Sequence, residues 1–258
     1  MFQDALKEFD ASVTDIETTL EFVKSSAWLR PRLGGMLDWN ILEPTVKPGI
    51  QMFLKQDTSG VDTVFRGMII ILAGSFEQLV RRFLKDGVIF ISKKYPRYSD
   101  LPGALVTQNI LRSGQALTTI AEPPDHINLN YELLCENLGT TKKTSEAVIL
   151  NADAFALFYS GLTPHKLEEV FKRIGFELKW DDIGRRPVIQ KLFGVTKTRE
   201  AATAAQSYLK EFTQNRNRSA HSGSGGKEIT SSNVSDGIIF LREFATALSE
   251  LISAKLTA

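Results

Sequence analysis

The stretch QNRNRSAH, residues 214–221, brings an arginine, an amide and an imidazole together at helical spacing. Asn217 and His221 are four residues apart, so a helix places them on one face. The long side chain of Arg216 lies beside that face and can bend toward the imidazole. An imidazole can transfer protons near neutral pH. The stretch therefore predicts a polar site, with a histidine suited to acid–base chemistry, at the end of a helix.

The helix that must position these groups is predicted over residues 198–221. Its inner seam is apolar at Ala202, Ala205, Leu209 and Phe212, and the next seam position is Arg216. A buried guanidinium without a partner is costly, so Arg216 should meet a carboxylate or face a wet cleft. Alternatively, Arg216 is a core-edge arginine that extends its charged end to water.

A second strong helix is predicted over residues 61–86 and is apolar on all sides in its middle, which indicates a central position. Gly67 and Gly74 suggest that a neighbouring helix crosses it closely. Glu77 lies within this apolar stretch and is the candidate carboxylate partner for Arg216. The alternative, equally weighted, is that Glu77 lies on a solvent stripe beside Arg81, its i+4 neighbour.

The remaining segments also favour helices. An apolar stripe from Phe2 to Val23 predicts an N-terminal helix that packs on the chain's own core, with packing on a second copy as the weaker alternative. Residues 28–56 predict a connection with at most a short helix. The final helix is expected over residues 233–255. We predict one all-α domain, residues 1–258, with an N-terminal segment 1–56 and a core 61–258. The core is a helical bundle with additional short helices inserted in the middle.

Composition narrows the function. The net charge is +1, so binding of a polyanion would need a local patch. Cys135 is the single cysteine, which excludes an internal disulfide, fits a reducing compartment and predicts a buried thiol. The N-terminus does not resemble a signal peptide, and the longest apolar run is far shorter than a membrane span of about 20 residues. We therefore expect a cytoplasmic protein that does not enter a membrane.

Several familiar sites are absent from the sequence. There is no Gly-rich phosphate loop, dinucleotide fingerprint or nucleophile elbow. One cysteine and three distant histidines give no metal-binding spacing, so neither a metal nor another cofactor is expected. His126 and His165 are expected to be structural or surface residues.

The motif RNRSAH, residues 216–221, resembles the signature of the HEPN family (the higher eukaryote and prokaryote nucleotide-binding domain), in which four to six residues separate an arginine from a histidine. The order of a motif helix, a Gly-containing loop and a last amphipathic helix is similar to the family pattern. The stretch AGSFEQLVRRFL, residues 73–84, resembles the prokaryotic subgroup called RiboL-PSP-HEPN.

This resemblance implies a metal-independent endoribonuclease in which the 2′-hydroxyl of the RNA attacks the neighbouring phosphate. His221 would move protons, Arg216 would neutralise the phosphate, and Asn217 would orient the imidazole or a phosphate oxygen. Family members act as homodimers with a composite site, and family habit suggests a bacterial defence or toxin role with a possible antitoxin or defence-system partner. The alternative is a non-catalytic helical module that binds RNA or a nucleotide or serves in assembly. A basic rim for RNA could be supplied by Arg81, Arg82, Arg218 and Lys227, although such charges are commonly ordinary solvated surface.

Overall fold

The fold is all-α, as predicted, and no strand occurs in the part of the chain that the computed structural model describes. These described residues are 2–37, 42–55, 59–95, 97–119, 129–140, 148–157, 161–221 and 228–257. Four helices are long: α1 (Gln3–Met36), α3 (Ser59–Lys94), α10 (Thr198–His221) and α11 (Ser231–Thr257). The shorter elements are α2 (Lys47–Lys55), η1 (Tyr98–Asp100), α4 (Gly103–Thr119), α5 (Tyr131–Thr140), α6 (Ala152–Leu157), α7 (Pro164–Lys172), α8 (Trp180–Gly184) and α9 (Pro187–Phe193).

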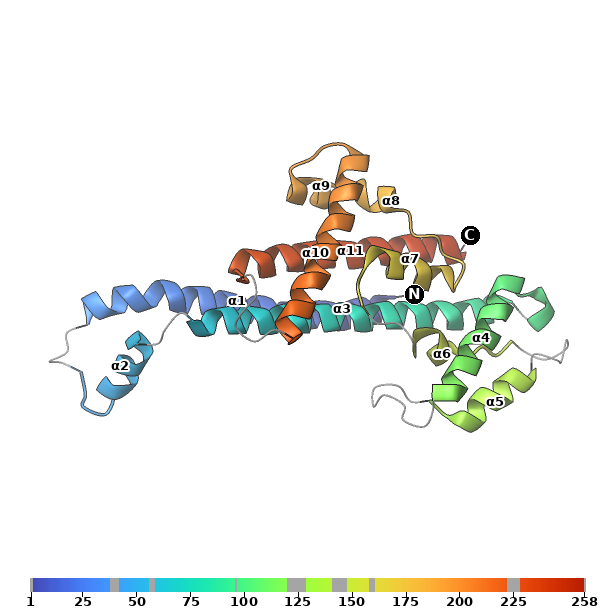
Figure 1. The fold of residues 1–258 in the computed structure, drawn as a ribbon, viewed down its shortest axis with the longest axis horizontal. Helices are drawn as coiled ribbons and strands as arrows, with labels where there is room; N and C mark the ends of the chain where they lie inside the picture. Colours follow the sequence, from blue (N-terminus) through green and yellow to red (C-terminus); the bar gives the residue numbers. More distant parts are fainter. Residues whose placement is uncertain are drawn as a thin grey trace.

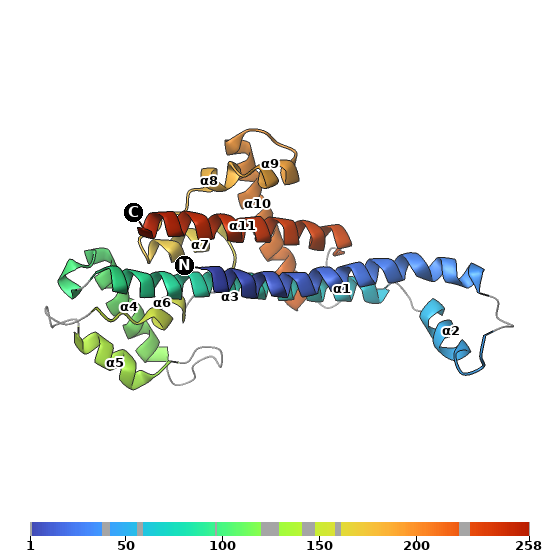
Figure 2. The same ribbon diagram turned by 180° about the vertical axis from the view of Figure 1, so that it is seen from behind.

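The body of the molecule is formed by α1, α3 and α11, which run side by side, and by α10, which crosses them steeply (Figure 1). The short helices α4 to α9 are inserted between α3 and α10, as predicted for the middle of the chain. The second half of α1 and α2 extend away from this body, as both ribbon views show (Figures 1 and 2).

The core is one continuous apolar cluster to which most of the helices contribute. Phe76 on α3 contacts Phe9 on α1 and Phe244 on α11, with ring centroids 5.7 and 5.6 Å apart. The N-terminal stripe is buried in this cluster, so the interpretation that it packs on the chain's own core is confirmed. Burial of these aromatic rings supplies a large share of the driving force for folding.

Helix α3 passes a length and composition test for a membrane span over Val61–Lys94, but half of its apolar window is buried within the fold. The central helices of globular cores pass the same test. Its contacts with α1, α6, α10 and α11 place it at the centre, as the sequence predicted. The apolar character of α3 is therefore accounted for by core packing.

Ion pairs join the outer helices to this core. The guanidinium of Arg242 on α11 donates to both carboxylate oxygens of Glu17 on α1, at 2.8 and 2.9 Å, and to Asp10 at 2.8 Å. Arg186, just before α9, contacts Glu243 and Glu250 on α11. These pairs are expected to add little to the free energy of unfolding, because the groups are partly exposed.

Three expectations were wrong. The connection predicted from residue 28 is in fact helical to Met36, with Pro31 inside α1; locally, Arg32 stacks on the ring of Trp28 at 4.1 Å and donates to its carbonyl. An added Cβ at Gly67 or Gly74 would meet nothing within 4 Å, so no helix crosses closely there. Cys135 is exposed, because the buried face of α5 carries Leu134 and Asn137 instead.

Candidate functional site

The helix of the motif ends where the sequence predicted: α10 covers Thr198–His221. Its seam residues Ala202, Ala205, Leu209 and Phe212 are buried, as expected. Beyond Phe212 the seam continues with polar side chains, and the helix backbone continues unchanged to His221. The sequence pattern therefore places a polar segment against the edge of an apolar core.

Three polar atoms in this segment are buried and have no hydrogen-bond partner: Asn215 Oδ1, Arg216 Nε and Ser219 Oγ. An unsatisfied buried polar group costs about 1–3 kcal/mol, so such atoms are rare and need an explanation. Asn215 is only 8% exposed and was not singled out from the sequence. Its position immediately before the motif arginine was the available signal.

Buried amides elsewhere in the chain do not share this feature. Asn151 donates from Nδ2 to Ser113 Oγ at 2.8 Å and to the Leu134 carbonyl at 3.2 Å. Its Oδ1 accepts from Asn137 at 2.8 Å, and its backbone N–H donates to Asn109 at 2.9 Å. The unsatisfied oxygen of Asn215 therefore contrasts with the fully bonded Asn151, although single guanidinium nitrogens of Arg66, Arg81 and Arg173 are also buried without a hydrogen bond.

The motif side chains open onto a small polar cavity of about 220 Å³. Arg216 and Asn217 line it from α10, and Glu77 lines it from α3. Residues just before α7 and in its first turn line the third side. The cavity is lined by Ala73, Glu77, Gly161, Leu162, Thr163, Lys166, Thr213, Arg216 and Asn217. Segments far apart in the sequence thus place two cations, one carboxylate and two threonine hydroxyls around one cavity.

Glu77 is 8% exposed, so the alternative that it lies on a solvent stripe is wrong. The direct ion pair with Arg216 is not formed either, although both side chains are described. Instead, Glu77 Oε1 accepts a hydrogen bond from the backbone N–H of Gly161 at 3.1 Å. The carboxylate is therefore satisfied by the backbone, and it holds the segment before α7 against α3.

The side chain of Arg216 is held by its neighbour. Its Nη1 donates to Asn217 Oδ1 at 3.1 Å, while its Nε is buried without a partner. We predicted that Asn217 would orient the imidazole or a phosphate oxygen, but in this structure its oxygen is engaged by the guanidinium. The positively charged guanidinium of Arg216 therefore lies at the cavity, and its Nε–H has no hydrogen-bond acceptor.

His221 is the last residue of α10 and its side chain is exposed. It lies five residues beyond Arg216, about one and a half turns along the helix. His221 is not among the residues that line the cavity, so the structure brings Arg216 and Asn217 to the cavity without the imidazole.

The predicted basic rim is found in part. Arg218 and Arg82 are exposed, and Arg82 lies 3.9 Å from Glu8. Arg81 is half-buried on α3, and Lys227 lies outside the described residues. His165 is exposed on the first turn of α7, as expected of a surface residue, whereas His126 lies outside the described residues. Only part of the predicted rim is thus available at the surface described.

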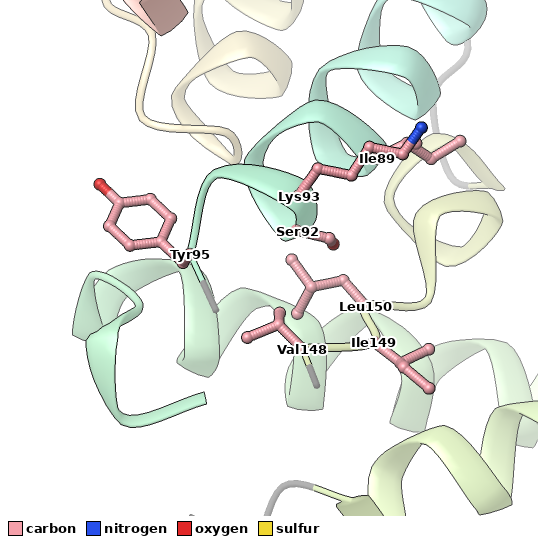
Figure 3. A pocket seen from close by; sticks show the side chains of 7 residues that line it. All are labelled: Ile89, Ser92, Lys93, Tyr95, Val148, Ile149 and Leu150. Carbon is pink, nitrogen blue, oxygen red and sulfur yellow. The ribbon is translucent and has the colours of Figure 1, made fainter. Parts of the chain in front are cut away.

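A second cavity of about 460 Å³ lies at the C-terminal end of α3, away from the motif (Figure 3). Ile89, Ser92, Lys93 and Tyr95 line it from α3 and the residue after it. The segment 148–150 supplies Val148, Ile149 and Leu150. The described residues of its lining are largely apolar and include one charged group, Lys93, so they offer little for acid–base chemistry.

Taken together, the fold and the site define an all-α protein with an Arg-x4-His motif at a helix end, beside a polar cavity. The chain matches the family described as RiboL-PSP-HEPN over residues 50–254, most of its length, and it therefore belongs to that family. Membership indicates an RNA-related function. No curated protein and no solved structure matches the chain.

Proposed function

We propose that the chain is a metal-independent endoribonuclease that cleaves RNA by attack of the 2′-hydroxyl on the adjacent phosphate. The observation that carries the proposal is the state of Arg216: it is tethered by Asn217, borders a polar cavity and keeps a buried N–H without a partner. A phosphate oxygen is the acceptor that a guanidinium binds best.

In the proposed reaction, the 2′-oxygen forms a bond to phosphorus as the bond to the 5′-oxygen of the next nucleotide breaks. A base removes the proton of the 2′-hydroxyl, and an acid gives a proton to the departing 5′-oxygen. The products are a 2′,3′-cyclic phosphate and a 5′-hydroxyl. His221 is assigned to proton transfer, and Arg216 to neutralising the charge that gathers on the phosphate oxygens.

One imidazole cannot easily serve as acid and base in the same step. We therefore propose a homodimer in which two chains contribute their motifs to one composite site. The exposed position of His221 at the end of α10 supports this proposal, because its imidazole is accessible to a second chain. A cytoplasmic location and a bacterial defence or toxin role, with a neutralising or defence-system partner, complete the proposal; they are suggested by the composition and by the family resemblance.

The test is cleavage of total RNA and tRNA by the purified protein. His221→Ala should lower the cleavage rate by roughly 10²–10⁴-fold, the usual contribution of a general acid or base, without changing the melting temperature. His165→Ala is the matched control, an exposed helical histidine that does not line the cavity, and should cleave as the wild type does. EDTA should have no effect, and the new ends should carry 2′,3′-cyclic phosphates.

Equal cleavage by wild type and His221→Ala, with contaminating nuclease excluded, would contradict the proposal. The second candidate function is a non-catalytic RNA- or nucleotide-binding or assembly module. One observation favours it: among the described residues, no hydrogen bond orients the imidazole of His221 for proton transfer. Wild-type protein that binds RNA but does not cleave it would support this second function.

A further inference from the structure

The wall of the cavity opposite α10 carries a second cation, Lys166, on the first turns of α7. Its side chain folds back across Gly161. A Cβ built on Gly161 would lie 3.2 Å from Lys166 Nζ, 3.6 Å from Cδ and 3.9 Å from Cε. The ammonium group therefore lies close to the backbone at residue 161, while the residue as a whole remains exposed.

Gly161 allows this arrangement for two reasons. Its φ is +89°, in the region that favours glycine, and the missing side chain leaves the space that Lys166 occupies. Its N–H is fixed by the carboxylate of Glu77 at 3.1 Å. Glu77 thus positions Gly161, and Gly161 gives the ammonium of Lys166 its place at the cavity.

The charges around the cavity favour an anion. Lys166 and Arg216 are cationic, and among the described residues of the lining Glu77 is the single carboxylate, with its Oε1 already bonded to the backbone. The volume of about 220 Å³ lies below the roughly 300 Å³ at which pockets for drug-sized ligands begin. The cavity therefore suits a short stretch of sugar–phosphate backbone whose base stays outside, rather than a whole nucleotide.

We propose that Lys166 is a substrate-positioning residue that binds the RNA phosphate next to the scissile one, while Arg216 binds the scissile phosphate. The proposal rests on the proposed endoribonuclease function. It assigns the two cations of one cavity to two successive phosphates of one strand, which sets the register of the RNA across α7 and α10. Phosphate contacts of this kind fix register without reading sequence.

The first experiment uses an oligonucleotide whose cleavage position has been mapped. One linkage beside that position is replaced by an uncharged methylphosphonate, on the 5′ side in one substrate and on the 3′ side in another. For wild type, kcat/KM should fall about tenfold for one of the two substrates, as expected for loss of a charge-assisted contact. Lys166→Ala should cause the same loss on the unmodified substrate, mainly through KM.

Testing Lys166→Ala on the modified substrate distinguishes a direct contact with one phosphate from a general effect of positive charge. If Lys166 contacts the replaced linkage, Lys166→Ala should lose nothing further on the modified substrate, because the two changes remove the same interaction. Lys166→Arg should restore most of the activity. Lys172→Ala is the matched control, an exposed lysine on the same helix that does not line the cavity, and should behave as wild type. Additive losses at both linkages, or a Lys166→Ala variant as active as Lys172→Ala, would overturn the inference.

A binding measurement separates this inference from the proposed function. In a His221→Ala background, the logarithm of RNA affinity is measured against the logarithm of salt concentration. Lys166→Ala should reduce the slope by about one phosphate contact, and by the same amount for different RNA sequences. If wild type does not cleave RNA, the nuclease proposal fails and this slope still tests the phosphate contact. An unchanged slope, or no RNA binding at all, overturns the role of Lys166.

Discussion

The two halves of α10 follow different rules although they form one continuous helix. The first half packs tightly on α8: a Cβ built on Gly184 would collide with the carbonyl oxygen of Thr198 and lie 2.7 Å from the Ala202 nitrogen. The second half carries the orphaned atoms of Asn215, Arg216 and Ser219 beside a cavity. The first half is optimised for contact, and the second retains polar groups that a ligand or a second chain could satisfy.

The difference suggests that the first half of α10 serves stability and the second half serves function. Unsatisfied polar atoms lower the free energy of unfolding, which is small in any folded protein. Within α10, these atoms lie only in the last turns. The tightly packed first half holds the second half in place. Substitutions in the first half should therefore lower stability, and substitutions in the second half should lower activity.

The largest effect is expected at Arg216. Arg216→Ala should lower RNA cleavage by roughly 10²–10³-fold, comparable to removing one donor to a developing negative charge. The free energy of unfolding should change by less than about 0.5 kcal/mol, because Glu77 keeps its bond to Gly161 and an unsatisfied Nε is removed. Urea unfolding and initial cleavage rates measure the two quantities.

Lys210→Ala, an exposed lysine on the same helix, is the control for Arg216 and should change neither quantity. A drop of more than about 2 kcal/mol in the free energy of unfolding of Arg216→Ala, with a matching loss of activity, would show that the arginine is structural.

A stability effect without direct contact with the site is expected at Gly184. Gly184→Ala should lower the free energy of unfolding by about 1–3 kcal/mol, because the new methyl group would collide with the backbone of α10. Gly67→Ala is the comparison: it lies in α3 with open space around it and should be stabilising by about 0.5–1 kcal/mol. Similar values for the two variants in urea unfolding would refute the tight contact between α8 and α10.

The smallest effect concerns the chain just beyond the motif. Asp62 on α3 accepts from Arg66 at 2.6 Å and from the backbone N–H of Ile229 at 2.8 Å, which anchors the entrance to α11. Burial would raise the pKa of Asp62, but these hydrogen bonds outweigh burial and hold the pKa below its ordinary value of 3.8. The resulting stabilisation is present above that value and is lost as the pH falls through the lower folded-state pKa.

Asp62→Asn should therefore be less stable than wild type by about 1 kcal/mol at pH 6. The difference should shrink toward zero as the pH falls below the folded-state pKa of Asp62. Denaturant unfolding of both proteins across this range gives the comparison. A difference that stays constant with pH would mean that the carboxylate charge contributes nothing to the anchor.

Much of the local structure was predictable. The helix of the motif, the short helix over PVIQKLF and the Thr163 cap of α7 follow from apolar periodicity and from capping residues, and the structure has all three. Thr163 Oγ1 accepts from the Lys166 backbone N–H at 3.4 Å, with Pro164 in the first turn. These signals lie within a few residues of one another, so a sequence window contains them completely.

Other features depended on neighbours that no sequence window contains. α8 was not anticipated, and its close contact with α10 comes from Gly184, whereas the glycines that seemed to mark a crossing, Gly67 and Gly74, face open space. Pro31 indicated a break, yet α1 continues through it. A glycine or a proline shows what the backbone permits, and the packing of distant segments decides whether that freedom is used.

The sequence by itself determined that the chain is all-α and that Arg216, Asn217 and His221 share the end of one helix, because helical periodicity is a local property. Only the tertiary structure decided that Glu77 bonds to Gly161, that Lys166 joins Arg216 at one cavity, and that Asn215 and Ser219 are left with unsatisfied atoms. These relations join α3, α7 and α10, which are distant in the chain, so they depend on how the core packs the three helices together.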